Sequence, residues 1–280
     1  MSLISKAATV FLSLICITGC ERPLLDDMIT SRISFVTVGN GGTLQPANSG
    51  FSRLNTMVYD IDGFRIWSKV HTQTAPSDTF GTVNLSLPSG DYYILAVGHS
   101  SDVSATLNGP QDVRFTASNG EKLTDTWSYL GLVHDNASPT FIMQRVSAMF
   151  RLIITDSIPH DVHRLRFDSK GGSANFNPLT LQGITKSTQS EVRRLSSDGI
   201  YEVYTFPYLA EECTLQMTVS ALDALDNVVY QRQFLNVPVR RNYITTFRGD
   251  LFSTDAVIDA SHTSMTFTVS DWNTMYNFTF

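Results

Sequence analysis

The feature that most constrains the fold is a period-two alternation of apolar and polar residues, which recurs from Ile33 almost to the C-terminus. Side chains of a β-strand point alternately to opposite faces, so this pattern predicts half-buried strands. Gly, Pro, Asn or Asp separates the runs, and no convincing amphipathic helix interrupts them. The chain is therefore predicted to be all-β and built of antiparallel β-sandwiches.

Two turns locate neighbouring strands. Asp62-Gly63 separates the runs 54–61 and 64–70, and it predicts a hairpin because Asp-Gly readily adopts the positive-φ conformation of a tight turn. Pro88-Ser89-Gly90 turns the run 82–87 into the run 91–97, which we interpret as a second strand pair. The second of these runs is apolar on both faces, which is typical of a central strand in a sandwich.

The alternation is longest from Phe141 to Ile154, and this run predicts the longest strand of the chain. About 260 residues follow the N-terminal leader, enough for one large all-β domain or for two domains of ~130 residues. We place a domain boundary just before Phe141, which divides residues 32–140 from residues 141–280. Between residues 98 and 139 the pattern is weak.

The first residues have the layout of a secretory signal peptide: one positive side chain by Lys6, an apolar block over residues 7–17, and small residues after it. The apolar block is much shorter than the ~20 residues that cross a bilayer as a helix. We therefore expect residues 1–19 to be removed and not to remain as a membrane span.

The end of this leader, Ile17-Thr18-Gly19-Cys20, resembles a bacterial lipobox, in which cleavage leaves a lipid-modified cysteine at the new N-terminus. The alternative is an ordinary signal peptide that contains a cysteine. Two or three acyl chains on Cys20 would hold the protein durably to a membrane through a tether of residues 20–31. Glu21, not Asp, follows Cys20, so nothing resembles an inner-membrane retention signal, and we expect the outer membrane.

Composition excludes some partners. The formal net charge is −6 and the isoelectric point is about 5.4, and no basic cluster exceeds two residues, so nucleic acid is not expected to bind. Cys16 leaves with the leader and Cys20 carries lipid, which leaves Cys213 as a single thiol and rules out an internal disulfide framework. We expect Cys213 to be a small buried apolar residue.

No motif for catalysis or metal binding is complete. The run Asp60–Gly63 begins like a calcium loop, but Arg65 and His71 stand where such a loop needs Gly and Glu. His160 and His163 lack the further ligands of a zinc site. The chain also lacks a nucleophile elbow and a phosphate-binding loop. We predict no enzyme, metal or cofactor, although the 26 carboxylates do not by number exclude a glycosidase pair.

Four short motifs occur in an order and at a spacing that resemble the fimbrillin-associated anchor lipoproteins of type V pili, the FimB-like family. They are Val58-Tyr59-Asp60-Ile61-Asp62-Gly63, Leu85-Ser86-Leu87-Pro88-Ser89-Gly90-Asp91-Tyr92 with Ala96-Val97-Gly98, Arg145-Val146-Ser147-Ala148, and Arg241-Asn242-Tyr243-Ile244-Thr245-Thr246-Phe247-Arg248-Gly249. The resemblance implies two transthyretin-like sandwich domains in tandem, export as a lipoprotein, and a role in anchoring or assembling a fimbria from pilin subunits.

The mechanism that the resemblance implies is β-strand exchange, in which an extended segment completes a neighbour's sheet. Tyr276, Phe278 and Phe280 alternate with polar residues and form the candidate donor strand; the alternative is that they belong to the last strand of their own sandwich. In similar pilins, cleavage after an arginine in an early loop removes the first strand. Arg53, which closes the loop 39–52, is the only residue placed for such a cut.

Whether the mature protein keeps its first strand distinguishes two possible functions. An anchor should keep this strand, whereas a tip or stalk pilin should lose it. The alternative to an anchor is therefore a tip or stalk pilin, or an adhesin that binds a host protein or a glycan.

Overall fold

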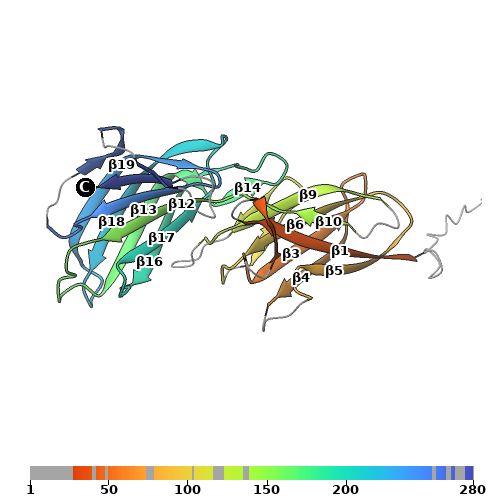
Figure 1. Cartoon of the computed structure of the whole chain (residues 1–280), viewed down its shortest axis with the longest axis horizontal. Coiled ribbons are helices and arrows are strands. Elements are labelled where there is room, and N and C mark those ends of the chain that lie inside the picture. The colour runs from red at the N-terminus through yellow and green to blue at the C-terminus, as the bar shows by residue number, and fades with distance from the viewer. Residues whose placement is uncertain are drawn as a thin grey trace, which may run out of the picture.

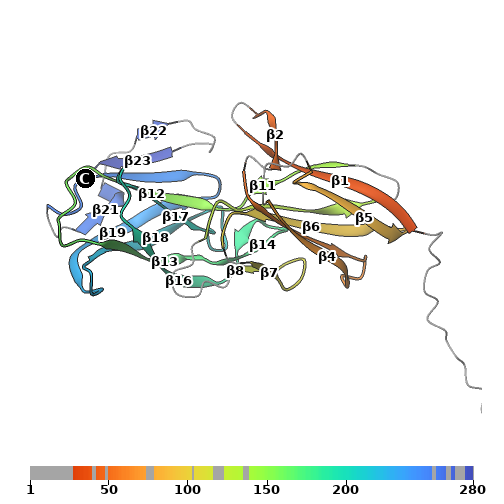
Figure 2. The ribbon, with the colours of Figure 1, turned by 90° about the horizontal axis from the view of Figure 1, so that it is seen from below.

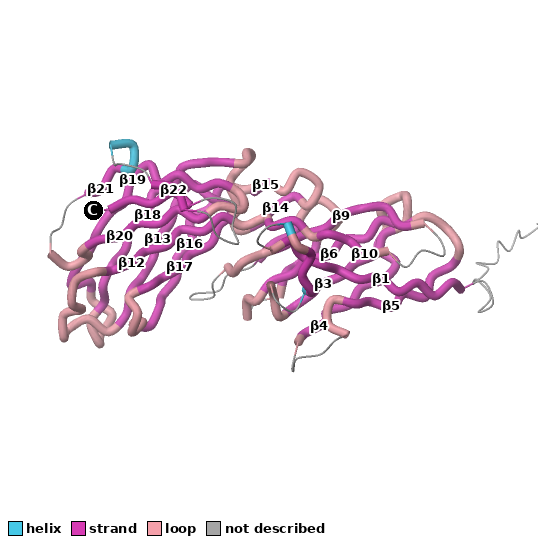
Figure 3. The backbone as a smooth tube through the Cα atoms, in the orientation of Figure 1, coloured by secondary structure: helices cyan, strands magenta, loops and turns pink. Residues whose placement is uncertain are grey.

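The computed structural model describes residues 28–39, 42–47, 50–73, 79–102, 104–115, 123–134, 139–253, 257–262, 266–268 and 275–279. Within these ranges the chain forms strands and no α-helix, and Ala260–His262 forms a 3-10 turn (Figure 3). The all-β prediction is confirmed. The strands gather into two lobes along the long axis of the molecule (Figure 1).

The first lobe consists of two sheets packed around one core. In sheet A, β1 (Met28–Val38) pairs with β2 (Leu44–Pro46), β5 (Thr82–Pro88) and β10 (Thr140–Ile142). Sheet B has the order β11 (Gln144–Arg145), β9 (Trp127–Val133), β6 (Tyr92–His99), β3 (Arg53–Tyr59) and β4 (Arg65–Thr72). The core between them includes Ile33, Phe35, Leu54, Val83 and Ile94.

The second lobe repeats this arrangement with two larger sheets. Sheet D has the order β17 (Ile200–Thr205), β12 (Ala148–Ile154), β20 (Ile244–Gly249), β23 (Met275–Thr279) and β22 (Thr266–Thr268). Sheet E has the order β16 (Lys186–Arg194), β13 (Arg164–Ser173), β18 (Glu212–Leu222), β19 (Val228–Arg240) and β21 (Val257–Asp259). Phe150, Phe167, Phe234 and Phe247 are fully buried between these sheets.

A fifth sheet joins the two lobes. Sheet C has the order β15 (Gln182–Gly183), β14 (Asn175–Asn177), β8 (Val113–Phe115) and β7 (Ala105–Leu107), and it lies in the middle of the molecule (Figure 2). β14 comes from the second half of the sequence and pairs with β8 from the first half. The sheet covers a mixed core in which Phe115 contacts Phe206 and Phe206 contacts Phe176.

Two local predictions are confirmed. β3 and β4 form an antiparallel hairpin, and Gly63 at its turn has a φ of 86°, the conformation that an Asp-Gly turn provides. β6 lies between β3 and β9 in the interior of sheet B, as its two-faced apolar run predicts.

Three other local predictions are wrong. The run 141–154 is not one strand: β10 pairs with β1, β11 with β9 and β12 with β17 and β20, so the chain changes sheets twice. β5 and β6 are not a pair, because the turn at Pro88 carries the chain from sheet A to sheet B. Pairing is not purely antiparallel either, since β1·β10, β12·β20, β19·β21 and β20·β23 are parallel.

Candidate functional site

The strand at the start of the described chain is held firmly over half of its length. β1 makes seven antiparallel residue pairs with β5 and also pairs with β2 and β10. From Ile33 onward its alternate side chains, Ile33, Phe35 and Thr37, are buried, whereas its first five residues are exposed or half-buried. Burying a large apolar side chain contributes roughly 1.5 to 3 kcal/mol. Removing β1 would therefore open a long apolar groove.

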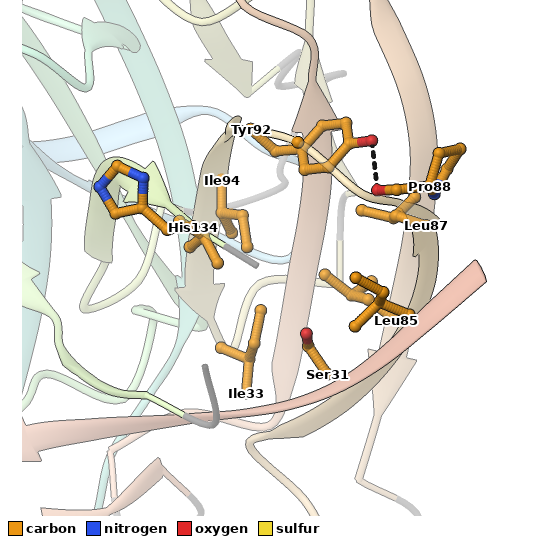
Figure 4. A pocket seen from close by; sticks show the side chains of 11 residues that line it. Ser31, Ile33, Leu85, Leu87, Pro88, Tyr92, Ile94 and His134 are labelled. Atoms are coloured by element: carbon orange, nitrogen blue, oxygen red, sulfur yellow. Dashed lines mark hydrogen bonds between the residues drawn. The ribbon is translucent and has the colours of Figure 1, made fainter. Parts of the chain in front are cut away.

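A small pocket lies under the loosely packed half of β1. Ile33, Leu85 and Ile94 line its facing sides, and the Tyr92 hydroxyl closes one side by donating to the carbonyl oxygen of Pro88 at 2.7 Å (Figure 4). Its free volume is about 20 Å³, which is close to the space of one water molecule. The pocket is therefore a packing gap beneath a strand and is too small for an organic ligand.

Arg53, the residue placed for proteolytic processing, is the first residue of β3 in the structure. Its backbone pairs with Thr72 of β4 and with His99 of β6. Burial, together with the nearby Arg53 charge, lowers the pKa of His99 to about 4. His99 is fully buried, and its Nε2 accepts from the Asn55 amide at 2.8 Å. A protease can cut after Arg53 only if this end of β3 leaves the sheet.

The C-terminal strand is docked in its own sheet. β23 runs parallel to β20 and antiparallel to β22. Phe278 is 1% exposed, and its ring stacks on Phe247 at a centroid distance of 4.5 Å and an angle of 13°. The side chain of Tyr276 and the whole of Phe280 lie outside the described residues, as does Cys20. In this structure the segment therefore occupies the position of a last strand.

A buried polar cluster lies where the two lobes meet, and the sequence analysis did not identify it. The Arg145 guanidinium donates from Nε to both carboxylate oxygens of Asp125, at 2.9 and 3.0 Å, and from Nη1 to Asn242 Oδ1 at 2.8 Å. It also lies 4.1 Å above the Trp127 ring. Ser147 Oγ donates to Asp125 at 3.0 Å. The cluster therefore links β9 and β11 to the turn between β19 and β20.

This cluster explains why two of the motifs occur together in one sequence. The motif that begins at Arg145 and the motif that contains Asn242 are 97 residues apart, yet their side chains bond directly. Their backbones are joined as well, because Asn242 N donates to Ser147 O at 2.9 Å. A charged residue inside an otherwise apolar alternation is the sequence signal that could have revealed the contact.

The described part of the chain offers little support for a metal site or a reactive thiol. In the ranges that the structure describes, no group of three or more His, Cys, Asp or Glu side chains could hold a metal ion. No helix in those ranges is long and apolar enough to cross a membrane. Cys213 is half-buried in β18, and burial raises the pKa of its thiol. A thiol with a raised pKa is a poor nucleophile at neutral pH.

The docked terminal strands and the polar junction between two stacked sandwiches define an all-β protein of two lobes. The sequence model of the fimbrillin-A associated anchor proteins Mfa1 and Mfa2 matches residues 24–278. Because the match covers nearly the whole chain, the protein belongs to this family of fimbrial anchor proteins. Membership confirms the resemblance and the prediction that the chain is not an enzyme, and it associates the protein with fimbrial subunits at the cell surface.

Two solved structures share the fold of this chain at low identity, and a third match is weaker. A candidate adhesin from Bacteroides ovatus is 14% identical, with 73% of this chain and 77% of that chain covered and a TM-score of 0.51. Candidate polysaccharide-binding proteins from Bacteroides thetaiotaomicron give 10% identity, coverages of 74% and 80%, and a TM-score of 0.52. The fimbrial anchor protein Mfa2 from Porphyromonas gingivalis gives 14% identity, coverages of 73% and 81%, and a TM-score of 0.42. No curated protein sequence matches the chain significantly.

Proposed function

We propose that this protein is the lipid-bound anchor of a type V fimbria. Acyl groups on Cys20 hold it in the outer membrane, and β-strand exchange joins it to the neighbouring pilin subunit. The match to the anchor family over residues 24–278 is the observation that carries the proposal. The burial of Ile33 and Phe35 supports it further, because an anchor whose first strand is firmly docked keeps its own groove filled and ends the fibre at its base.

The proposal includes a division of the chain. Residues 1–19 are the lipoprotein signal peptide, residues 20–31 the tether, and residues 32–140 and 141–280 two transthyretin-like sandwiches. From Met28 onward the tether already pairs with β5 as the start of β1. The separate cores of the two lobes support two sandwiches. The boundary falls inside β10, which pairs with β1, and β11 still pairs with β9, so the chain enters the second lobe only after Arg145.

In this scheme the C-terminal segment is the donor, with Tyr276, Phe278 and Phe280 as the side chains that fill a neighbour's groove. Donation requires β23 to leave β20, which removes the Phe278 ring from its stack on Phe247. The docked strand is then the state before assembly. Main-chain hydrogen bonds lost to β20 would be regained in the partner's sheet, while alternate side chains would fill its pockets.

Mass spectrometry and N-terminal sequencing of protein extracted from the cell surface test the anchor. We expect a mature chain that starts at an acylated Cys20, with residues 28–38 present. A chain that starts at Leu54, after cleavage at Arg53, would refute the anchor and favour a tip or stalk pilin. The variant Cys20→Ser should release the protein from the membrane fraction, and Cys213→Ser is its matched control and should not.

The length of fimbriae on cells that lack the gene provides a second test. Loss of an anchor should release or lengthen the fibres, because nothing ends them at the membrane. Unchanged fibres, together with binding of the isolated protein to a host protein or a glycan, would contradict the anchor and support an adhesin.

A further inference from the structure

β4 is a long strand at the free edge of sheet B. It pairs with β3 on one side, and no other strand in the described part of the chain pairs with it on the other (Figures 1 and 2). In an antiparallel ladder the edge strand directs alternate backbone N–H and C=O groups away from its partner. β4 spans eight residues, Arg65–Thr72, and contains no proline. Its outward backbone groups are therefore available to another strand.

The side chains of β4 also differ from those of the edge strand β5. Ile66 and Val70 are 43% and 54% exposed, and Phe64 just before the strand is 71% exposed. On the edge strand β5, by contrast, the exposed residues are the polar Asn84 and Ser86. Natural proteins protect open edges with polar or charged side chains, prolines or short strands. β4 instead combines an open backbone with exposed apolar side chains.

The charges on β4 restrict what can pair with it. Arg65 and Lys69 are exposed, and the strand carries no carboxylate. Arg53 at the start of the neighbouring β3 adds a third cation. Like charges placed opposite each other across a strand pair are destabilising. A second copy of this chain would add the same cations and no carboxylate at β4, so it offers Arg65 and Lys69 no opposite charge to pair with.

We propose that β4 is a docking edge for an extended segment of another protein in which apolar residues alternate with Asp or Glu. The segment adds a sixth strand to sheet B. Its main chain bonds to the open edge, its apolar residues cover Ile66 and Val70, and its carboxylates pair with Arg65 and Lys69. This site is separate from the lipidated Cys20 and from the exchange of β23. The docking proposal can therefore be refuted while the anchor proposal stands.

Fluorescence anisotropy with a labelled ten-residue peptide of alternating valine and glutamate tests the edge on the full mature chain. The double variant Arg65→Glu/Lys69→Glu should weaken binding at least about tenfold, because two cross-strand attractions become repulsions. The matched variant Lys186→Glu/Arg194→Glu makes the same charge change on the edge strand β16 and should bind within about twofold of the wild type. A valine–lysine peptide should not bind.

Amide hydrogen exchange on the wild-type protein shows where the peptide binds without depending on the fold of any variant. Addition of the acidic peptide should slow exchange within residues 65–72 and leave β18 unchanged. No binding, equal binding of the lysine peptide, or protection at β16 instead of β4 would overturn the proposal. A dimer that protects β4 in the absence of peptide would also overturn it, because a second copy would then be the occupant.

Discussion

Replacing Arg145 with alanine should destabilise the protein by about 2 to 4 kcal/mol. Breaking a buried ion pair by removing one partner costs roughly 3 to 5 kcal/mol, because the remaining charge is left buried. The Arg145 side chain is 8% exposed but that of Asp125 is 21% exposed, so water can partly resolvate the carboxylate and lower the cost. In the variant Asp125 keeps the hydrogen bond from Ser147. The contact with Asn242 is lost too.

Urea unfolding followed by tryptophan fluorescence measures this change, since Trp127 lies directly beneath the guanidinium. Arg114→Ala is the matched control. Its ion pair with Asp112 has side chains that are 56% and 27% exposed, and such surface pairs contribute about 0 to 1 kcal/mol. A double-mutant cycle with Asp125→Asn isolates the pairwise energy. If Arg145→Ala lowers the free energy of unfolding no more than Arg114→Ala does, the junction does not depend on the Arg145–Asp125 ion pair.

Three further perturbations follow from single contacts. Phe278→Ala removes a fully buried stacked ring and should cost about 3 to 5 kcal/mol in urea unfolding, whereas Thr279→Ala on the exposed side of β23 should change little. The folded-state pKa of His99 is about 4, below its ordinary 6.5, so the unfolded chain binds the proton more tightly. Stability should be full above pH 6.5 and fall by about 3 kcal/mol as the pH drops to 4; His99→Gln should flatten this slope, and an unchanged slope would contradict the assignment. Gly171→Ala places a Cβ 2.5 Å from the Thr214 carbonyl oxygen at a φ of 115°, so it should lower the free energy of unfolding by about 1 to 3 kcal/mol. A smaller loss would show that the register shift of β13 between Lys170 and Ser173 adapts to the added methyl group.

The sequence predicts which residues face the core far better than it predicts which strands are neighbours. Alternation reports a strand's buried face, so it correctly indicates Ile33 and Phe35 and the apolar faces of β6 and β12. Alternation carries no information about which other strand a given strand pairs with. The run 141–154 alternates throughout, yet it contributes to three sheets, because β10, β11 and β12 all need the same half-buried pattern.

The lobe junction escapes a periodicity analysis for a different reason. The strands of sheet C are only two or three residues long, so none gives a measurable alternation. Two of them, β7 and β8, lie together with β9 in the stretch 98–139, whose pattern is weakest. The turn at Pro88-Ser89-Gly90 shows a similar limit. Turn residues indicate that the chain reverses, but a hairpin within one sheet and a crossing between two sheets use the same residue types.

The terminal strands and the junction form one line along the molecule. β1 begins at the end of the first lobe remote from the second lobe, and β23 lies in the second lobe (Figure 1). In the proposed anchor, tension from the fibre therefore passes from the second lobe through the junction to Met28. Antiparallel hydrogen bonds are perpendicular to the strands, so a pull along β1 loads its seven residue pairs with β5 together.

No strand pair at the junction between the lobes is as long as the pairing of β1 with β5. β8 and β14 share two residue pairs, so backbone pairing alone would make this the weak point of the line. Arg145 bonds across the same boundary to Asn242 through a charge-assisted hydrogen bond, a type roughly twice as strong as a neutral one, and its ion pair with Asp125 in the first lobe holds the guanidinium in place. A charge-assisted cluster placed where the backbone ladder is shortest fits a chain that carries load from end to end, and a chain that only presented a binding loop would have no need of it.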